Sequence, residues 1–455
     1  MKRAVALMVI LAASLAYAQR EMAAPQPQYD QLFVEEAPGV FFFPVNLVGD
    51  TPEKSRIEVL YRIDVRFFVP VRATGAGATD PFVRRGEILV ELVNEAGIST
   101  ARDIRRVDIG EKDPDFIPEA KVWHEGVASF SVEPGEYTIV FEVDDLESSR
   151  QFLDRKQKIR AEAFKGDGVL TSTPLFVLPQ SDAHTFIPVN IGGDMLFGKG
   201  AALFVQVYAP KLTNTPVRVE YSIATQRYFL QESRVVATDT IEALQSLPHP
   251  SPIRLAGTPT TYMFAPFDTN QSVQAFLIPL KAEKLPLRPL TLKLQITQNT
   301  LEVSLEREFK MVWPDMPMSL RDVDFALEAL RHITRPEELD SLKAGTQNTR
   351  LKHLEEFWKA KDRTPETEYN EVMVEYYRRV DHTMRAFSSI RGGDGYRTDR
   401  GRIYILHGPP TKTERMLDPQ AGYQEIWTYE KLGKRFVFLD QAKNGNYILI
   451  ASQNI

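Results

Sequence analysis

The fold of the C-terminal part of this chain is indicated most clearly by residues 357–412. Their sequence is FWKAKDRTPETEYNEVMVEYYRRVDHTMRAFSSIRGGDGYRTDRGRIYILHGPPTK. Thr364-Pro365 is a favourable helix start, which predicts a helix from residue 366 on. Its buried stripe would consist of Met373, Tyr376, Val380, Met384 and Phe387. After a glycine-rich passage, residues 402–407 are expected to form a strand. This stretch therefore joins helices to a sheet.

Three further helices are expected between residue 315 and Thr364. Ser319 would cap the first helix, with Asp322 at its third position. Thr334 and Glu337 would form a capping box around Pro336 at the start of the second, which should stop at Gly345. The third would bury one face, made of Leu351, Leu354, Phe357 and Trp358.

Downstream of residue 412 the pattern predicts strands again, over residues 423–430, 435–440 and 447–451. The connections between them are short, and one contains Asn444-Gly445, a strong hairpin signal. An antiparallel β meander is therefore expected at the end of the chain. Residues 315–455 would form a helical connector followed by an α+β domain.

Residues 39–179 and 180–314 are expected to form two tandem Ig-like β-sandwiches, so the whole chain is multi-domain and mainly β. The clearest strand covers residues 57–69, where apolar residues alternate with charged ones. Residues 127–132 and 137–143, joined by Glu133-Pro134-Gly135-Glu136, predict a hairpin. The stretch that follows Pro134 resembles the penultimate strand of Ig-like bacterial sandwiches. Residues 170–178 would close the first domain.

A short internal match suggests that one sandwich arose by duplication of the other, although chance similarity of two strand–turn pieces is the alternative. The prediction is that the two copies occupy equivalent strands. The matching segments are Pro44-Val45-Asn46-Leu47-Val48-Gly49-Asp50 and Pro188-Val189-Asn190-Ile191-Gly192-Gly193-Asp194.

Residues 1–18 are typical of a secretory signal peptide. Lys2 and Arg3 precede an apolar run, and Ala16-Tyr17-Ala18 predicts cleavage between Ala18 and Gln19. The run is too short to span a bilayer, and no later run is longer, so no transmembrane segment is expected in the mature chain. Residues 19–38 would be a flexible leader. We expect export to the periplasm or the medium.

Composition excludes several classes of chemistry. The chain has no cysteine, which excludes disulfides, thiol catalysis, a lipid-bearing cysteine and cysteine-ligated zinc. Its net charge is −6, and losing Lys2 and Arg3 with the signal peptide would bring it to −8. Without a cluster of lysines and arginines, nucleic acid is not expected as a partner.

Known catalytic and cofactor motifs are not found in the sequence, and no cofactor is expected. Glu328 and His332, and likewise His353 and Glu356, have the spacing of metal ligands on a helix. Two ligands do not make a zinc site, so we interpret both pairs as solvated helix faces and expect no metal.

The stretch quoted first resembles the GWxTD domain, a module of secreted bacterial proteins with no established reaction. The helical part of the family's pattern matches from Phe357-Trp358 to Val380, and the core pattern G-W-x-T-D-R-G-R-x-Y-I-x-x-G-P-P matches from Gly395 to Pro410. Tyr396 stands where the family has its namesake tryptophan. The candidate site residues in and around this pattern are Trp358, Asp362, Asn370, Glu371, Tyr396, Thr398, Asp399, Arg400, Arg402, Tyr404, His407, Gly408 and Pro409.

These residues allow a structural interpretation, in which a rigid turn locks helices onto the sheet, and a functional one, in which Asp399, Arg400, Arg402 and His407 form a polar cluster in a cleft. The leading expectation for function is a non-enzymatic envelope protein that contacts protein or glycan. The alternative is a hydrolase of an envelope polymer centred on Asp399, Arg402 and His407. A third possibility is a carrier or chaperone that uses exposed sheet edges. The oligomeric state is left open.

Overall fold

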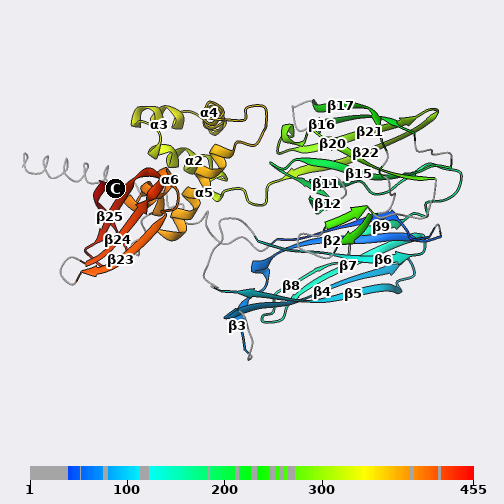
Figure 1. The fold of residues 1–455 in the computed structure, drawn as a ribbon, viewed down its shortest axis with the longest axis horizontal. Helices are drawn as coiled ribbons and strands as arrows, with labels where there is room; N and C mark the ends of the chain where they lie inside the picture. Colours follow the sequence, from blue (N-terminus) through cyan, green and yellow to red (C-terminus); the bar gives the residue numbers. More distant parts are fainter. Residues whose placement is uncertain are drawn as a thin grey trace, which may run out of the picture. The chain divides into compact units, whose positions relative to one another are not determined.

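The computed structural model describes residues 39–51, 53–74, 80–112, 122–181, 185–210, 215–226, 233–245, 247, 252–255, 261–264, 272–388, 394–418 and 422–455. The predicted signal peptide, its cleavage site at Ala18 and Gln19, and the leader at 19–38 lie outside these residues. The chain divides into two compact units (Figure 1). One contains Glu36–Asp315 with Thr364–Asn370, and the other contains Met316–Arg363 with Glu371–Ile455.

The first sandwich packs a three-stranded sheet on a six-stranded sheet. The smaller sheet has the order β1-β2-β6 and is antiparallel. In the larger sheet β4 lies between β5 and β7, and β3, β8 and β9 extend it. The strands are β1 (Val40–Val48), β2 (Ser55–Asp64), β3 (Pro70–Arg72), β4 (Phe82–Asn94), β5 (Ser99–Glu111), β6 (Trp123–Val132), β7 (Gly135–Asp145), β8 (Gln151–Asp154) and β9 (Lys158–Ala161).

Strand β2 carries the alternation that the sequence predicts, but both of its faces are covered. Ile57, Val59 and Ile63 are fully buried between the two sheets of the first sandwich. Leu60, on the opposite face, packs against the second sandwich in another apolar cluster. Strand β2 ends at Asp64, and the predicted continuation to residue 69 is instead a short 3-10 turn, Val65–Phe67.

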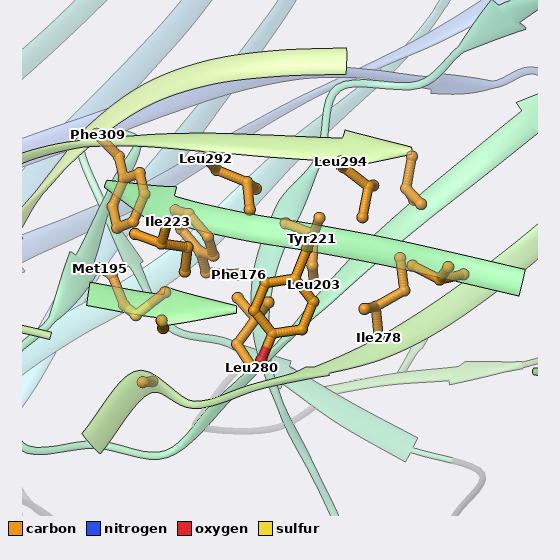
Figure 2. Close-up of a cluster of buried hydrophobic side chains, with 14 of the residues drawn as sticks. Phe176, Met195, Leu203, Tyr221, Ile223, Ile278, Leu280, Leu292, Leu294 and Phe309 are labelled. Atoms are coloured by element: carbon orange, nitrogen blue, oxygen red, sulfur yellow. The ribbon is translucent and has the colours of Figure 1, made fainter. Parts of the chain in front are cut away.

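The second sandwich again pairs two sheets, and its core is built from residues of strands in both sheets (Figure 2). Its strands are β10 (Leu170–Thr171), β11 (Leu175–Pro179), β12 (Thr185–Pro188), β13 (Asn190–Ile191), β14 (Asp194–Leu196), β15 (Ala201–Tyr208), β16 (Val217–Thr225), β17 (Val235–Leu244), β18 (Pro252–Leu255), β19 (Thr261–Phe264), β20 (Val273–Leu280), β21 (Pro289–Gln298) and β22 (Leu301–Val312).

The strand pairings of the two sandwiches repeat in the same chain order. In the first, β2 lies between β1 and β6, and β4 lies between β5 and β7. In the second, β15 lies between β11 and β20, and β16 lies between β17 and β21. Both are Ig-like sandwiches with three plus four core strands.

The duplicated motif itself does not occupy equivalent strands, so that prediction is wrong. Asn46 lies in β1 and pairs with Ile57 of β2. Pro188 instead ends β12, and Asn190 begins β13, which pairs with β14. The counterpart of β1 is β11, which precedes the second motif. The first copy lies mostly within β1, whereas the second covers the end of β12, β13 and the turn into β14, so the match links segments of different structure.

Two other predictions about the sandwiches need correction. Residues 127–132 and 137–143 do not form a hairpin, because β6 pairs with β2 and β7 pairs with β4 in the other sheet. Tyr137 fixes this crossing by donating a hydrogen bond from its hydroxyl to the Glu133 carbonyl at 2.8 Å, the tyrosine corner of Ig-like domains. Residues 170–178 do not close the first sandwich either, since β10 and β11 pair with β15.

Residues 364–370 belong to the unit that contains the sandwiches, which corrects the predicted helix start at Thr364-Pro365. This segment is not helical. The Tyr369 ring packs edge-on against Trp313 and Phe197, with ring centroids 5.8 and 5.5 Å away. The Glu368 amide donates to the Glu283 carbonyl at 2.8 Å. Local cap chemistry is therefore overridden by packing on the end of the second sandwich.

The C-terminal unit begins with helices that share one apolar core. They are α2 (Val323–Ala329), α3 (Pro336–Lys343), α4 (Gln347–Lys359), α5 (Glu371–Ala386) and α6 (Asp399–His407). Asp322, and not Ser319, caps α2 by accepting from the Phe325 amide at 2.8 Å. Helix α3 begins at Pro336 as predicted but lacks a capping box, because the Thr334 hydroxyl donates to the Leu330 carbonyl instead. No helix in the described part of the chain is long and apolar enough to cross a membrane.

The chain ends in an antiparallel sheet of order β23-β24-β25-β26, so the predicted meander is confirmed. Its strands are β23 (Lys412–Asp418), β24 (Gly422–Tyr429), β25 (Lys434–Asp440) and β26 (Ile448–Asn454). The prediction of a strand over residues 402–407 is wrong, because these residues lie in α6. Ile403 and Tyr404 of α6 pack on Trp427 and Phe438 of the sheet. Helix α6 thus joins the helices to the sheet, together with Phe387 just after α5.

Candidate functional site

The predicted motif residues converge on the start of α6. Thr398 is the N-cap: its hydroxyl oxygen accepts from the Gly401 amide at 3.0 Å and its hydroxyl donates to the Gly395 carbonyl at 2.7 Å. Asp399 follows in the first turn, where the helix dipole favours a negative charge. Both residues thus stabilise the turn from which the helix grows.

Asp399 also ties α6 to the edge strand of the sheet. One carboxylate oxygen accepts from the Leu449 amide of β26 at 2.8 Å, and the other lies 3.3 Å from Arg402 Nη2. Arg402 is about half exposed, its side chain having 44% of its surface accessible. The Asp399–Arg402 pair is therefore a partly solvated ion pair, whereas the bond to Leu449 holds two elements together.

Arg400 points into the interior between α6 and the sheet. Its Nη1 lies 3.3 Å from Glu425 Oε2, and its Nη2 donates to the Gly445 carbonyl at 3.2 Å. The guanidinium also lies over the Tyr447 ring, 4.0 Å from its centroid. Burial lowers the pKa of Arg400, opposed by the nearby Glu425 charge. Glu425 also accepts from the indole of Trp427 at 2.7 Å, so its carboxylate has several partners, whereas Arg400 Nε is buried and makes no hydrogen bond.

Two glycines of the motif allow backbone segments to touch. A Cβ on Gly395 would lie 1.8 Å from the Thr383 carbonyl oxygen of α5. A Cβ on Gly401 would lie 2.1 Å from the Gly395 carbonyl oxygen. Only glycine therefore lets the turn Gly395–Arg397 lie between α5 and α6.

Tyr396, at the position of the family's tryptophan, is fully buried in the helical core. Its ring meets Phe325 edge-on with centroids 5.3 Å apart, and its hydroxyl oxygen accepts from Arg397 Nε at 2.7 Å. Burial raises the pKa of the Tyr396 hydroxyl well above its ordinary value. The packing role of the aromatic ring survives the replacement of the indole.

The C-terminal end of α6 is formed by stacked rings and a turn at Gly408. Tyr404 stacks on His382 with centroids 4.3 Å apart, and His407 stacks on Phe436 at 5.5 Å. Burial lowers the pKa of His407, with the charges of Lys434 and Arg379 acting in the same direction. Gly408 ends the helix at a φ of 78°, and its carbonyl accepts from the Tyr429 hydroxyl at 2.8 Å. Pro409 is exposed.

The other four candidate residues lie outside this cluster. Trp358 is buried in the helical core and donates from its indole to the Tyr377 hydroxyl at 3.2 Å. Asp362 is half-buried just after α4. Asn370 is buried immediately before α5, and Glu371 is exposed in the first turn of that helix.

A charged group beside the turn was missed by sequence reasoning, although two of its residues were noted for their spacing. Glu328 is paired with Arg331 at 3.1 Å, Lys343 at 2.5 Å and Arg397 at 3.4 Å. His332 donates from Nε2 to the Tyr396 carbonyl at 2.8 Å. These contacts hold α2 and its 3-10 extension against the Tyr396 turn.

We predict that His332 makes the C-terminal unit lose stability in mild acid. Burial lowers the pKa of His332 from 6.5 to about 4, and the charges of Arg331 and Arg402 add to this effect. The unfolded chain therefore binds the proton first as pH falls, so stability is complete above about pH 6.5 and is lost between there and about pH 4. From about pH 7 to about pH 5 the loss should be about 2 kcal/mol.

Calorimetry of the full chain at these two pH values, with and without His332→Gln, would measure this effect. The transition of the C-terminal unit should fall by several degrees more in the wild-type chain than in the variant. Equal shifts in the two proteins would contradict the prediction.

A second candidate site lies within the other unit, where the two sandwiches meet. A small cleft, with a volume of only about 20 Å³ or room for about one water molecule, is lined by Phe41, Phe43, Arg62, Glu125 and Gly192, among others. Arg62 Nε lies 2.7 Å from Glu125 Oε1, and both side chains are mostly buried. Burial lowers the pKa of Arg62 and raises that of Glu125, each opposed by the partner's charge. Sequence reasoning missed this site because its residues come from separate strands.

Comparison with known families identifies the C-terminal part. Residues 296–454 match the GWxTD domain. This chain contains a GWxTD domain. The match begins inside β21, so the domain takes in the last strand of the second sandwich as well as the helices and the terminal sheet. The Thr398–Pro410 part of the motif thus forms the α6 junction of the GWxTD domain.

Comparison with solved structures gives only weak similarities. The chain is similar to Escherichia coli alpha-2-macroglobulin activated by porcine elastase, at 11% identity over 61% of this chain and 24% of that chain, with a TM-score of 0.15. The chain is also similar to a Salmonella alpha-2-macroglobulin mutant, at 10% identity over 61% of this chain and 21% of that chain, with a TM-score of 0.15. The chain thus spans less than a quarter of these relatives' length, and such scores do not establish a shared fold. No curated protein sequence matches the chain.

The three residues of the predicted hydrolase site do not converge. Asp399 and Arg402 are paired at the start of α6, while His407 lies at its other end. Eight residues of α-helix separate Asp399 from His407 by about 12 Å along the axis. His407 stacks on Phe436 and meets Tyr429 edge-on, and both rings belong to the terminal sheet. This arrangement does not supply an acid–base pair within reach of one substrate atom.

Proposed function

We propose that this GWxTD protein is exported to the cell envelope and binds protein or glycan there without catalysing a reaction on it. The observation that carries the proposal is the use of the motif's charged residues. Asp399 holds the Leu449 amide and Arg400 holds Glu425 and the Gly445 carbonyl, all within the GWxTD domain. Groups committed to such internal contacts stabilise a domain and are not positioned for substrate.

The rest of the chain is consistent with a binding role. Two Ig-like sandwiches share a buried interface, at which the Asn46 amide donates to Thr173 Oγ1 at 3.0 Å and the Val48 amide to Gln206 Oε1 at 3.0 Å. These two bonds join β1 to β15 and to the segment just before β11. Such interfaces between domains are frequent places for ligand sites.

Export is part of the proposal and is supported by the sequence of residues 1–18. The protein would be periplasmic or extracellular. Expression of the full chain in cells, followed by N-terminal sequencing of the protein outside the cytoplasm, tests this. A mature chain starting at Gln19 supports export, and an intact chain retained in the cytoplasm contradicts it.

Binding without catalysis can be tested on envelope material from the cells that encode the chain. Purified chain without residues 1–18 would be mixed with this insoluble material, sedimented and assayed, and the supernatant would be analysed for new reducing ends and released peptides. We expect the protein in the pellet and no released products. Digesting the material with a protease beforehand separates a protein partner, whose loss abolishes sedimentation, from a glycan.

The hydrolase alternative makes the opposite prediction in the same assay. Soluble products would accumulate with time, and Asp399→Asn or His407→Gln would abolish them while leaving sedimentation intact. Absence of the chain from the pellet would contradict the proposed binding function itself.

A further inference from the structure

Residues 364–370, called the strap from here on, belong to the unit that contains the sandwiches, while the residues on either side belong to the C-terminal unit. In the described part of the chain, the backbone therefore passes between the two units at three places, after Asp315, after Arg363 and after Asn370. If the strap joined the C-terminal unit, only the passage after Asp315 would remain. The state of the strap thus sets the number of covalent links between the units.

The ring of Tyr369 holds the strap on the end of the second sandwich. It packs edge-on against Phe197 and Trp313, whose own centroids lie 5.2 Å apart. Gly198 makes room for the ring, because a Cβ on this residue would lie only 2.4 Å from it. All three aromatic side chains are half-buried. A half-buried contact of this kind can hold a segment in place and can also open locally while the sandwich stays folded.

The strap's own sequence favours a helix, although the docked strap is not helical. Thr364 is a preferred N-cap residue, and Pro365 is a preferred first residue of a helix. Glu366 would lie in the first turn, where the helix dipole favours a negative charge. These are the signals from which the sequence predicts a helix starting at Thr364-Pro365. The strap therefore has a second conformation for which its local chemistry is suited.

The docked and helical conformations exclude each other, because they use the Glu368 amide differently. In the docked strap this amide donates to the Glu283 carbonyl of the sandwich unit at 2.8 Å. In a helix capped by Thr364, the same amide would donate to the Thr364 carbonyl, four residues back. The Thr367 amide already donates to that carbonyl at 2.9 Å, so the strap begins with a turn from which a helix can grow.

Helix α5 begins at Glu371, directly after the strap. A helix over residues 365–370 would therefore continue into α5 without a break. The carbonyls of residues 367–369 would then accept from the amides of residues 371–373, as in the interior of any α-helix. Starting a helix is the costly step and lengthening one is not, so the existing α5 favours a helical strap once the strap has left the sandwich.

We propose that the strap is a two-state switch, docked on the second sandwich through Tyr369 in one state and forming an N-terminal extension of α5 in the other. Release lengthens α5 by residues 365–370 and leaves the passage after Asp315 as the one covalent link between the units in the described chain. A partner that binds one state better than the other would shift the strap between them. The switch does not depend on the binding function proposed above.

Hydrogen exchange of the full chain, resolved to single amides by fragmentation mass spectrometry, tests the switch in Tyr369→Ala. This variant removes the docking ring and places a strong helix former in the strap. The amides of residues 371–373 should exchange at least about tenfold more slowly than in the wild-type chain, because they would move from the end of a helix to its interior. Unchanged or faster exchange of these amides would mean that the released strap unfolds, and the switch would be wrong.

A second variant releases the strap without changing its sequence. In Gly198→Ala the added Cβ would overlap the Tyr369 ring, so the ring has to leave its position. The matched control is Gly97→Ala, where the φ of 76° imposes the same backbone strain as the 73° at Gly198 but nothing lies within 4 Å of the Cβ. Gly198→Ala should slow the exchange of the same amides, and Gly97→Ala should not. Equal exchange rates in these two variants would overturn the proposal.

A third variant separates helix formation from loss of the ring. Tyr369→Gly also removes the docking contact, but glycine is a much weaker helix former than alanine. The amides of residues 371–373 should therefore be less protected in Tyr369→Gly than in Tyr369→Ala. Equal protection in these two variants would show that the slower exchange does not come from a helical strap, and the extension of α5 would be refuted.

Discussion

Replacing Gly395 with alanine should destabilise the GWxTD domain by about 4 kcal/mol, more than ordinary overpacking of a core costs. The added Cβ would lie 1.8 Å from the Thr383 carbonyl oxygen, 2.7 Å from its carbon and 3.0 Å from the Ser388 amide nitrogen. All three are backbone atoms, so no rotamer change relieves the overlap. Either α5 or the Gly395 turn has to move, and the buried Tyr396 ring would move with the turn.

Hydrogen exchange of the full chain is the suitable measurement, because unfolding of a multi-domain protein is not two-state. Amides of α5 and α6 should exchange about a hundredfold faster or more in Gly395→Ala, and those of β4 and β7 in the first sandwich should not change. Gly445→Ala is the control: its φ is 82° but nothing lies within 4 Å of its Cβ. It should cost only about 1 kcal/mol. Equal effects of the two substitutions would refute the packing role of Gly395.

The sequence predicts those elements whose local periodicity agrees with their packing. Helix α5 has its apolar stripe where expected, with Tyr376, Val380 and Met384 buried, and its Glu375–Arg379 pair forms at 2.7 Å. The terminal sheet is predicted because its turns are short and carry strong turn residues. In each case, the residues close by in sequence are enough to predict the type of secondary structure.

Helix α6 shows where such reasoning fails. Ile403, Tyr404 and Ile405 are consecutive and all buried, and only Arg402 and Leu406 of the helix are exposed, so its buried residues do not form a narrow helical stripe. A short apolar run of this kind cannot be told from a buried strand by its period. What decides the matter is the cap at Thr398 and the packing of α6 between α5 and the sheet, and the second is a property of the tertiary fold.

The candidate site is likewise predicted from the sequence only in part. The motif residues are predicted as a group, and Thr398, Asp399 and Arg400 do lie together. Their partners are not visible in the local sequence, because the Leu449 amide and the Glu425 carboxylate lie far along the chain from them. The cleft between the sandwiches is harder still, since its polar pair arises from the register of β2 on β6.

Arg400→Met should cost the GWxTD domain about 4 kcal/mol, because it leaves the Glu425 carboxylate buried without its cation. The Glu425 side chain is only 4% exposed, so water cannot replace the guanidinium. Arg415 is no substitute, because its Nε lies 3.6 Å from the same carboxylate on a side chain that is 76% exposed. The Gly445 carbonyl and the Tyr447 ring would lose their contacts with the guanidinium as well.

A double-mutant cycle separates the buried charge from the lost packing. Glu425→Gln removes the charge but keeps an oxygen for the Trp427 indole, which donates to Glu425 at 2.7 Å. Arg400→Met/Glu425→Gln should therefore be more stable than Arg400→Met alone by about 2 kcal/mol. Exchange of β24 and β25 amides measures the difference. If the destabilisations of the two single variants simply add up in the double variant, the two side chains act independently. The role of Arg400 would then lie outside this network.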